Sequence, residues 1–388
     1  MANDLVASMV LAIWLYLLVA RGGFWLAAER DEGGPSAAIS GAWPAIAAVI
    51  PARDEAACIG ATVASLLGQN YPGDLRVVVV DDNSRDATGQ VARDAAAKLG
   101  KADRLTVLSG RALPAGWTGK LWAQQQGLTH VHELAAPPAY VLFTDADIVY
   151  APDAVSRLAV RAQADGAVLT SLMVKLHCTS FAERAFIPAF VFFFQMLYPF
   201  AWANDPPRAT AAAAGGCMLV RRDMLADAGG MAAIRGALID DCALAKLLKS
   251  RGPIWIGLTE RVRSIREYAA VADIRSMVSR TAYAQLRYSP ILLAGTILGL
   301  ALTYLAPVAL ALFASGFAQL AGILAWLAMA LAFWPTLRFY GLSVLWGLAL
   351  PAIALIYMVF TVDSAYQHAR GRGGMWKGRA QANVSELR

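Results

Sequence analysis

Residues that commonly hold zinc or form disulfides are scarce in this sequence. The 388 residues include 4 cysteines and 4 histidines. No two cysteines form a Cys-x-x-Cys pair and no histidine stands at metal-ligand spacing, which argues against a zinc site and against a disulfide framework. Dispersed thiols are typical of a reducing compartment. The cysteines are Cys58, Cys178, Cys217 and Cys242.

Charged residues are scarce as well. They make up 16% of the chain and the mean hydropathy is +0.48, both unusual for a wholly soluble protein. The net charge is +6, and much of the excess lies between Lys246 and Arg287, directly before a long apolar run. Basic residues beside a membrane segment favour the cytoplasmic face. No nucleic-acid partner is expected, because this cluster borders segments of hydrocarbon length.

Two glycine motifs that cradle nucleotides are missing. No Gly-x-Gly-x-x-Gly follows the first predicted strand, and no Gly-Lys-Ser or Gly-Lys-Thr occurs. Their absence argues against a Rossmann dehydrogenase and a P-loop ATPase. A sheet that binds a nucleotide without them uses acidic residues, which accept hydrogen bonds from the base and ribose while a metal ion carries the diphosphate.

Long apolar runs are present at both ends of the chain. Residues 5–20 and 24–28 are almost free of polar side chains, and we expect residues 1–30 to form a transmembrane anchor whose C-terminal end is cytoplasmic. A cleaved signal peptide is the alternative. It requires basic residues before the apolar core, whereas Asn3 and Asp4 stand there.

Three further apolar runs, 291–314, 317–334 and 341–360, predict transmembrane helices within residues 291–362, before a basic tail at 363–388. Three crossings from the cytoplasm would place that tail outside, although basic residues prefer the inside. Either one run is re-entrant or the positive-inside rule fails, and the sequence leaves both open. We expect a multi-pass protein of the bacterial inner membrane with a cytoplasmic catalytic domain.

An aromatic segment lies at about residues 183–204. Phenylalanine, tyrosine and tryptophan are dense there, and Pro188 and Pro199 bracket its centre. This composition predicts an interfacial element at headgroup depth, with a buried core helix as the alternative.

Strand and helix patterns alternate between Trp43 and Leu258. The alternation predicts an α/β domain at residues 43–265 with a mainly parallel, doubly wound sheet, followed by a juxtamembrane basic segment at 266–290. Right-handed crossovers place the ends of the parallel strands on one rim of the sheet. The predicted strands are 45–50, 75–80, 105–108 and 140–144, and the predicted helices are 57–67, 87–99 and 120–132.

Asp145 and Asp147 directly follow the predicted strand at 140–144. In extended backbone, side chains two residues apart point to the same side, so both carboxylates can face one small volume. Open α/β sheets bind ligands at this end of their strands, and Mg²⁺ or Mn²⁺ prefers a few carboxylates with substrate phosphates. The alternative is an Asx turn before a helix that begins near Pro152.

Five motifs in the same order resemble the nucleotide-sugar glycosyltransferases of family 2, which have the GT-A fold with a mixed sheet. Over the whole chain, the sequence is similar to hopene-associated glycosyltransferases, and the membrane layout is similar to that of ceramide glucosyltransferase. The motifs are VIPARDE at 49–55, VDDNSRD at 80–86, TDAD at 144–147, GGCMLVRR at 215–222 and IDD at 239–241.

The resemblance implies a donor site for a nucleotide-diphosphate sugar, with a UDP-sugar favoured. It places Pro51, Arg53 and Glu55 around the base and ribose, Asp82 on the nucleoside, and Lys120 on the diphosphate. It also implies that Asp147, helped by Asp145, holds Mg²⁺ or Mn²⁺.

On the acceptor side, the resemblance implies that Asp241 is the general base, with Asp240 beside it, and that Gly215 and Gly216 let the backbone approach the acceptor. One base without an internal nucleophile means single displacement with inversion. The implied acceptor is a lipid, as in hopanoid biosynthesis. Polyprenyl-phosphate, carotenoid and sphingolipid-type acceptors are alternatives, and a silent scaffold of a lipid pathway is the alternative without catalysis.

Some of these residues have structural explanations too. Asp240 and Asp241 precede a predicted helix at 242–249 and could cap it. Trp117 and Trp122 could belong to the core or stack on the donor. Lys120 begins a helix, where a cation is unfavourable unless a phosphate binds there.

The chain departs from the family's Gln-x-x-Arg-Trp motif. Gln285 stands two residues before Arg287, and Tyr288 replaces the tryptophan. This departure argues against a processive polysaccharide synthase, which uses the tryptophan to hold its growing chain. Arg287 is retained as a further candidate contact to the donor diphosphate.

Overall fold

The computed structural model describes residues 2–32, 39, 41–376 and 379–380. The chain forms two compact units. The sheet unit comprises residues 29–177 and 202–266, with the described residues from 375 onward. The helical unit comprises residues 1–28, 178–201 and 267–374. Each is described by itself.

The sheet unit is built on an eight-stranded mixed sheet in the order β3-β2-β1-β4-β7-β6-β8-β5. Strands β3, β2, β1 and β4 run parallel to one another. Strand β7 runs antiparallel to β4 and to β6, and β5 runs antiparallel to β8. The bounds are β1 Ile46–Ala52, β2 Leu75–Asp81, β3 Leu105–Ser109, β4 Tyr140–Thr144, β5 Ile148–Tyr150, β6 Leu169–Lys175, β7 Cys217–Arg221 and β8 Ile254–Ser264.

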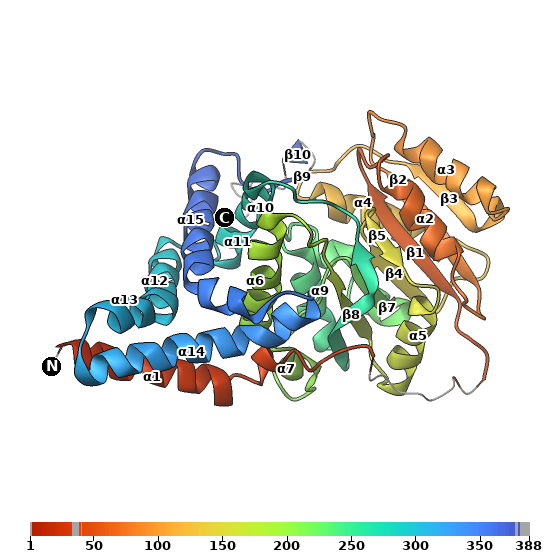
Figure 1. Cartoon of the computed structure of the whole chain (residues 1–388). Helices are drawn as coiled ribbons and strands as arrows, with labels where there is room; N and C mark the ends of the chain where they lie inside the picture. Colours follow the sequence, from red (N-terminus) through yellow and green to blue (C-terminus); the bar gives the residue numbers. More distant parts are fainter. Residues whose placement is uncertain (1, 33–38, 40, 377–378, 381–388) are drawn as a thin grey trace. The chain divides into compact units, whose positions relative to one another are not determined.

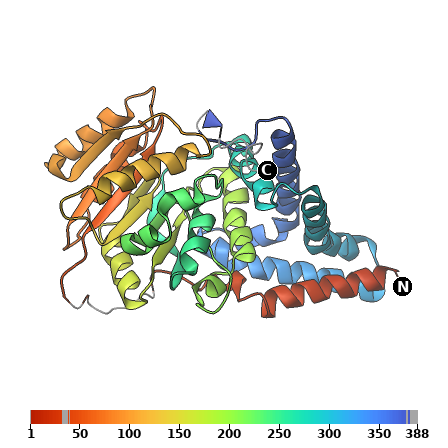
Figure 2. The ribbon, with the colours of Figure 1, turned by 180° about the vertical axis from the view of Figure 1, so that it is seen from behind.

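Helices cover both faces of this sheet (Figures 1 and 2). One face packs against α2, α3 and α5, and the other against α4, α8 and α9. The predicted strands and helices of this region are all present, with ends that differ by a few residues. The helix bounds are α2 Ile59–Leu67, α3 Thr88–Lys98, α4 Gly119–His132, α5 Ala154–Ala164, α8 Arg222–Asp227 and α9 Asp240–Lys249.

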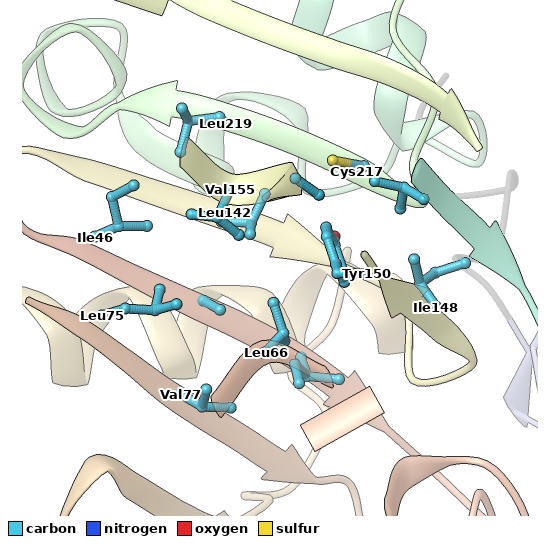
Figure 3. Packing of buried hydrophobic residues seen from close by; sticks show 14 of the residues in the cluster. Ile46, Leu66, Leu75, Val77, Leu142, Ile148, Tyr150, Val155, Cys217 and Leu219 are labelled. Carbon is cyan, nitrogen blue, oxygen red and sulfur yellow. The ribbon is translucent and has the colours of Figure 1, made fainter. Parts of the chain in front are cut away.

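The central strands are apolar on both faces because both faces are covered. Figure 3 shows one of the two cores, where Ile46, Leu142 and Leu219 from neighbouring strands lie side by side. On the other face, α4 approaches β1 closely at Gly127, where a Cβ would lie 2.5 Å from a methyl of Val49. This packing fixes the N-terminus of α4 at the rim where the parallel strands end.

The helical unit contains three helices long and apolar enough to cross a membrane, Pro290–Phe313, Gly316–Phe339 and Val344–Ala369. They confirm the three predicted C-terminal runs. A π-helical turn at Ala301–Leu305 interrupts the first. The bounds within the unit are α1 Ala2–Val19, α6 Phe181–Leu197, α10 Val271–Ser279, α11 Ala282–Gln285, α12 Pro290–Leu300, α13 Ala306–Phe313, α14 Gly316–Phe339 and α15 Leu350–Ala369.

The N-terminal helix is shorter than the predicted anchor. Its apolar part, Asn3–Val19, is about 26 Å long, against about 30 Å of hydrocarbon. Gly22 and Gly23 adopt φ of +64° and +60°, a left-handed conformation that ends helices, so residues 24–28 do not extend it. The helix lies along α14 in the same unit (Figure 1).

The aromatic segment forms α6, which contributes to the core of the helical unit. Phe192 packs against Phe333, with ring centroids 5.2 Å apart, and Phe186 packs against Tyr357. Phe181 stays 76% exposed at its N-terminus. The side of α6 that carries Phe186 and Phe192 therefore packs as a core helix does. The position of α6 at headgroup depth stays a prediction.

Candidate active site

A partly buried lysine and two aspartates form the first part of the site. Lys120 lies at the N-terminus of α4, where Thr118 caps the helix by accepting from the backbone N–H of Leu121. Lys120 Nζ lies 3.0 Å from Asp145 Oδ1 and 3.1 Å from Asp240 Oδ2. Asp145 directly follows β4 and Asp240 begins α9, so the lysine connects two elements that are distant in sequence.

The charges in this cluster depend on one another. Burial lowers the pKa of Lys120, but the carboxylates of Asp145, Asp240 and Asp241 outweigh burial and raise it. Burial raises the pKa of Asp145, against the opposing charge of Lys120. Lys120 is therefore a permanent cation, and its two carboxylate partners explain how a positive charge is tolerated at a helix N-terminus.

Asp241 lies beside this cluster and has a different environment. Its Oδ2 accepts from the backbone N–H of Gly215 at 3.0 Å, and its Oδ1 accepts from the N–H of Cys242 at 2.7 Å. Burial, followed by the charge of Asp240, raises its pKa to about 6. Ile239, rather than either aspartate, occupies the N-cap position of α9. Asp241 is a first-turn carboxylate poised to exchange a proton near neutral pH.

Gly215 approaches both groups closely. A Cβ at this position would lie 3.2 Å from Lys120 Nζ and 3.4 Å from Asp241 Oδ2, so the lysine ammonium would have to shift slightly to accept a side chain there. The carbonyl of Gly216 accepts from the Thr144 hydroxyl at 2.8 Å, which fixes the turn to the end of β4. The structure thus brings Gly215, Lys120 and Asp241 together, as the motifs predicted.

A second part of the site is centred on an arginine. Arg266 donates to both carboxylate oxygens of Glu55, at 2.7 and 2.8 Å, and through Nε to Asp147 Oδ2 at 3.0 Å. The same Asp147 oxygen accepts from the Ser264 hydroxyl at 2.8 Å. Glu55 and Asp147 are buried. Arg266 therefore bridges Glu55, which was predicted to bind the donor, and Asp147, which was predicted to bind the metal ion.

Asp145 and Asp147 do not share a partner. The backbone between them is a turn rather than extended strand, so the same-side argument for extended chain does not apply. One carboxylate is paired with Lys120 and the other with Arg266. They remain close enough for the charge of Asp147 to raise the pKa of Asp145.

The nucleoside side of the predicted site lies after β1 and β2. Pro51 is within β1, next in register to Val80 of β2. The Arg53 guanidinium donates to the carbonyl of Asp82 at 2.5 Å and lies 3.8 Å from its carboxylate. Both residues are buried. These residues line one rim as predicted, and their roles in binding stay predictions.

The remaining candidate residues, two tryptophans and an arginine, are divided between the two units. Trp117 and Trp122 pack edge to face, with centroids 5.3 Å apart, and only Trp117 packs against a core cluster. Arg287 belongs to the helical unit, where it and Tyr288 adopt φ of +52° and +56°. Its contact with a donor diphosphate stays a prediction.

The carboxylates of this site meet part of what a divalent ion requires. Within the described residues, no group of three or more His, Cys, Asp and Glu side chains is arranged to hold a metal. Nucleotide sites need fewer, because one or two carboxylates and the substrate phosphates complete the shell of Mg²⁺. Asp240 Oδ2 is buried without a hydrogen bond, and its ion-pair partner is Lys120 Nζ at 3.1 Å. Asp147 and Asp145 are the carboxylates available to such an ion.

Sequence reasoning missed Ser264 and Arg266 as members of the site, having counted Arg266 among the juxtamembrane basic residues. Ser264 is opposite Ile148 in the β5–β8 pairing, and this places it and Arg266 beside Asp147. Neither β5 nor β8 was among the predicted strands, so the sequence carried no signal for this pairing.

Comparison with known proteins shows which family the sheet unit resembles. Residues 47–229 match the model of Glycosyl transferase family 2. Over these residues, which are just under half of the chain, the protein is similar to family 2 glycosyltransferases. The matched region holds the candidate residues from Pro51 to Gly216 but ends before Asp240, Asp241 and Arg266.

The chain is also similar to a Staphylococcus aureus (strain USA300) protein named 4,4'-diaponeurosporenoate glycosyltransferase, with 35% identity over 123 residues. The S. aureus strain Newman relative gives the same values. The matched part is 31% of this chain and 29% of the relative, so the chain spans well under two thirds of that protein.

A solved structure has a similar fold. The mannosyltransferase PcManGT from Pyrobaculum calidifontis, determined with GDP-Man and Mn²⁺, superimposes with a TM-score of 0.54 and 20% identity. The match covers 94% of this chain and 99% of that chain. At this identity the similarity establishes the fold, a GT-A mixed sheet domain with apolar C-terminal helices.

Proposed function

We propose that this protein is a membrane-bound inverting glycosyltransferase that moves a sugar from a nucleotide-diphosphate sugar to a lipid acceptor. The observation that carries the proposal is the partly buried cluster of Lys120, Asp145, Asp240 and Asp241 around Gly215. It combines a fixed cation for a leaving diphosphate with a carboxylate whose pKa suits proton removal. A silent scaffold would not need this arrangement.

Each residue has one task in the proposed reaction. Arg53, Glu55 and Asp82, with Pro51, bind the base and ribose. Lys120 stabilises the negative charge that develops on the leaving diphosphate. Mg²⁺ or Mn²⁺, held by Asp147 with Asp145, would supply further charge stabilisation there. Asp241 takes the proton of the acceptor hydroxyl.

A carotenoid-type acceptor is better supported than a hopanoid. The similarity to 4,4'-diaponeurosporenoate glycosyltransferase favours this alternative, whereas the hopanoid acceptor rests on sequence resemblance alone. The three apolar helices are consistent with an acceptor drawn from the bilayer. The donor bound by PcManGT, GDP-Man, makes GDP-sugars worth testing beside UDP-sugars.

A donor and acceptor screen tests the proposed function. Purified full-length protein with Mn²⁺ should convert one UDP- or GDP-sugar and a carotenoid acid or alcohol to a glycosylated product, detected by mass spectrometry. A hopanoid alcohol and a polyprenyl phosphate serve as the competing acceptors. If no sugar nucleotide is bound or slowly hydrolysed by the protein with any acceptor, the enzyme proposal fails.

We further propose that the C-terminal tail lies on the same side of the membrane as residues 271–288. In the helical unit, Tyr288 stacks on His368 at 4.4 Å, and the N–H of Tyr283 donates to the Ser364 hydroxyl at 3.0 Å. The start of α12 and the end of α15 thus lie together. An even number of crossings must separate them, so one of the three apolar helices is re-entrant or lies in the interface.

Cysteine labelling tests this topology. In a variant without native cysteines, Arg372→Cys and Arg280→Cys should both resist an impermeant maleimide in spheroplasts and both react after lysis. The basic residues of the tail then obey the positive-inside rule. Labelling of Arg372→Cys alone in intact spheroplasts would show that all three helices cross.

A further inference from the structure

Arg266 is the one cation that contacts both Glu55 and Asp147 among the ion pairs of the described residues. Its Nη2 bonds both oxygens of Glu55, while its Nε bonds Asp147. Its backbone N–H also donates to the Ser264 hydroxyl at 3.2 Å, and that hydroxyl donates to Asp147. The arginine is therefore held from both its backbone and its side chain.

The bridge joins the two functions assigned to the donor site. Glu55 follows β1, on the base and ribose side, whereas Asp147 is the proposed carboxylate for the divalent ion. Both side chains are buried, with 10% and 9% exposed. Two buried carboxylates on neighbouring loops repel each other and need a cation between them. Arg266 supplies that cation.

The guanidinium itself is more accessible than its partners. The Arg266 side chain is 32% exposed, so it can turn toward solvent while the carboxylates remain in place. Asp147 Oδ2 accepts one hydrogen bond from the Ser264 hydroxyl and one from Arg266 Nε, so both of its lone pairs are occupied. A divalent ion that binds this oxygen must therefore displace Arg266.

We propose that Arg266 is a resident counter-ion of the donor site, which holds Glu55 and Asp147 in place before the donor binds and releases Asp147 when a divalent ion and a nucleotide diphosphate enter. The inference rests on the proposed metal role of Asp147. Arg266 is thus a positioning residue that competes with the metal. Without donor, the protein binds Mn²⁺ weakly because its own cation occupies the carboxylate.

Mn²⁺ affinity without donor separates competition from a structural role. Full-length protein in detergent is titrated with Mn²⁺, and the free ion is followed by electron paramagnetic resonance. Arg266→Ala and Arg266→Gln should bind Mn²⁺ about tenfold more tightly than the parent protein, because the buried carboxylates lose their competing cation. Arg266→Lys, which keeps a cation but loses the two-pronged contact, should fall between. A merely structural arginine would weaken binding when removed.

Arg263→Ala is the matched control. It removes the same charge from an exposed position in β8, three residues before Arg266, and should leave Mn²⁺ affinity unchanged. Thermal melting establishes that each variant is folded, and Arg266→Gln or Arg266→Lys carries the result if alanine does not fold.

The outcomes distinguish this inference from the proposed function. Equal or weaker Mn²⁺ binding by Arg266→Gln, with binding that still depends on Asp147, overturns the role of Arg266 alone. Two outcomes would remove the metal role of Asp147 and this inference with it. One is Mn²⁺ binding that survives Asp147→Ala both in the parent protein and in Arg266→Gln. The other is no Mn²⁺ binding even when a nucleoside diphosphate is added.

Discussion

Replacing Asp241 with asparagine should reduce sugar transfer about a thousandfold while donor binding is kept. Burial and the charge of Asp240 raise the pKa of this partly buried carboxylate to about 6, so at neutral pH it is an unprotonated base. Asparagine has a similar shape and can still accept from Gly215, but it cannot take a proton. Transfer is measured by product mass spectrometry, and donor affinity by calorimetry on the same preparation.

The pH profile provides the internal control. Because the active form is the unprotonated carboxylate, the parent enzyme should lose activity as pH falls through about 6 and reach a plateau above it. The residual transfer rate of Asp241→Asn should not fall in this way as the pH decreases. Asp227→Asn, an exposed aspartate at the end of α8, should behave as the parent. Persistent transfer by Asp241→Asn would leave Asp241 only a first-turn carboxylate of α9.

Replacing Asp147 with alanine should remove metal-dependent donor binding. Its carboxylate is the buried oxygen group of the site that a divalent ion would use, and loss of the ion should weaken donor binding about a hundredfold or more, since such an ion contributes several kcal/mol. The measurement is donor affinity by calorimetry with Mn²⁺ and with chelator. The parent should show a large difference between the two conditions, and the variant should show none.

Asp153→Ala is the control for this experiment. Asp153 lies six positions on, half exposed and paired with Arg261, so its loss should leave donor affinity unchanged. Asp147→Asn is a second variant that keeps an acceptor for Ser264 and avoids a cavity. If Mn²⁺ still strengthens donor binding in both Asp147 variants, the metal is held elsewhere or is not used.

The predicted site residues of the sheet unit meet in the structure for reasons that the sequence already contained. Apolar strands covered on both faces must be parallel when helices alternate with them, and their ends then share a rim. This is why Arg53, Asp82 and Asp145 lie where parallel strands end, and why Lys120, at the start of α4, lies beside Asp145.

Other features followed from contacts between distant segments. The predicted N-terminal anchor is too long because Gly22 and Gly23 adopt a left-handed backbone, so the helix does not continue into residues 24–28. In the aromatic segment, Phe192 packs against Phe333 within the helical unit, a contact that the composition of the segment does not specify. Local composition carries no information about which distant surface a side chain will meet.

The sequence by itself determined the class of domain, the three apolar C-terminal helices and the identity of the candidate acids, since all three depend on local pattern. Only the tertiary structure decided which cation each acid faces. Asp145 and Asp147 are nearly adjacent in the chain, but one pairs with Lys120 and the other with Arg266. The reason is that strand β8 returns beside β5, a pairing set by the packing of the whole sheet and not by the residues around Asp147.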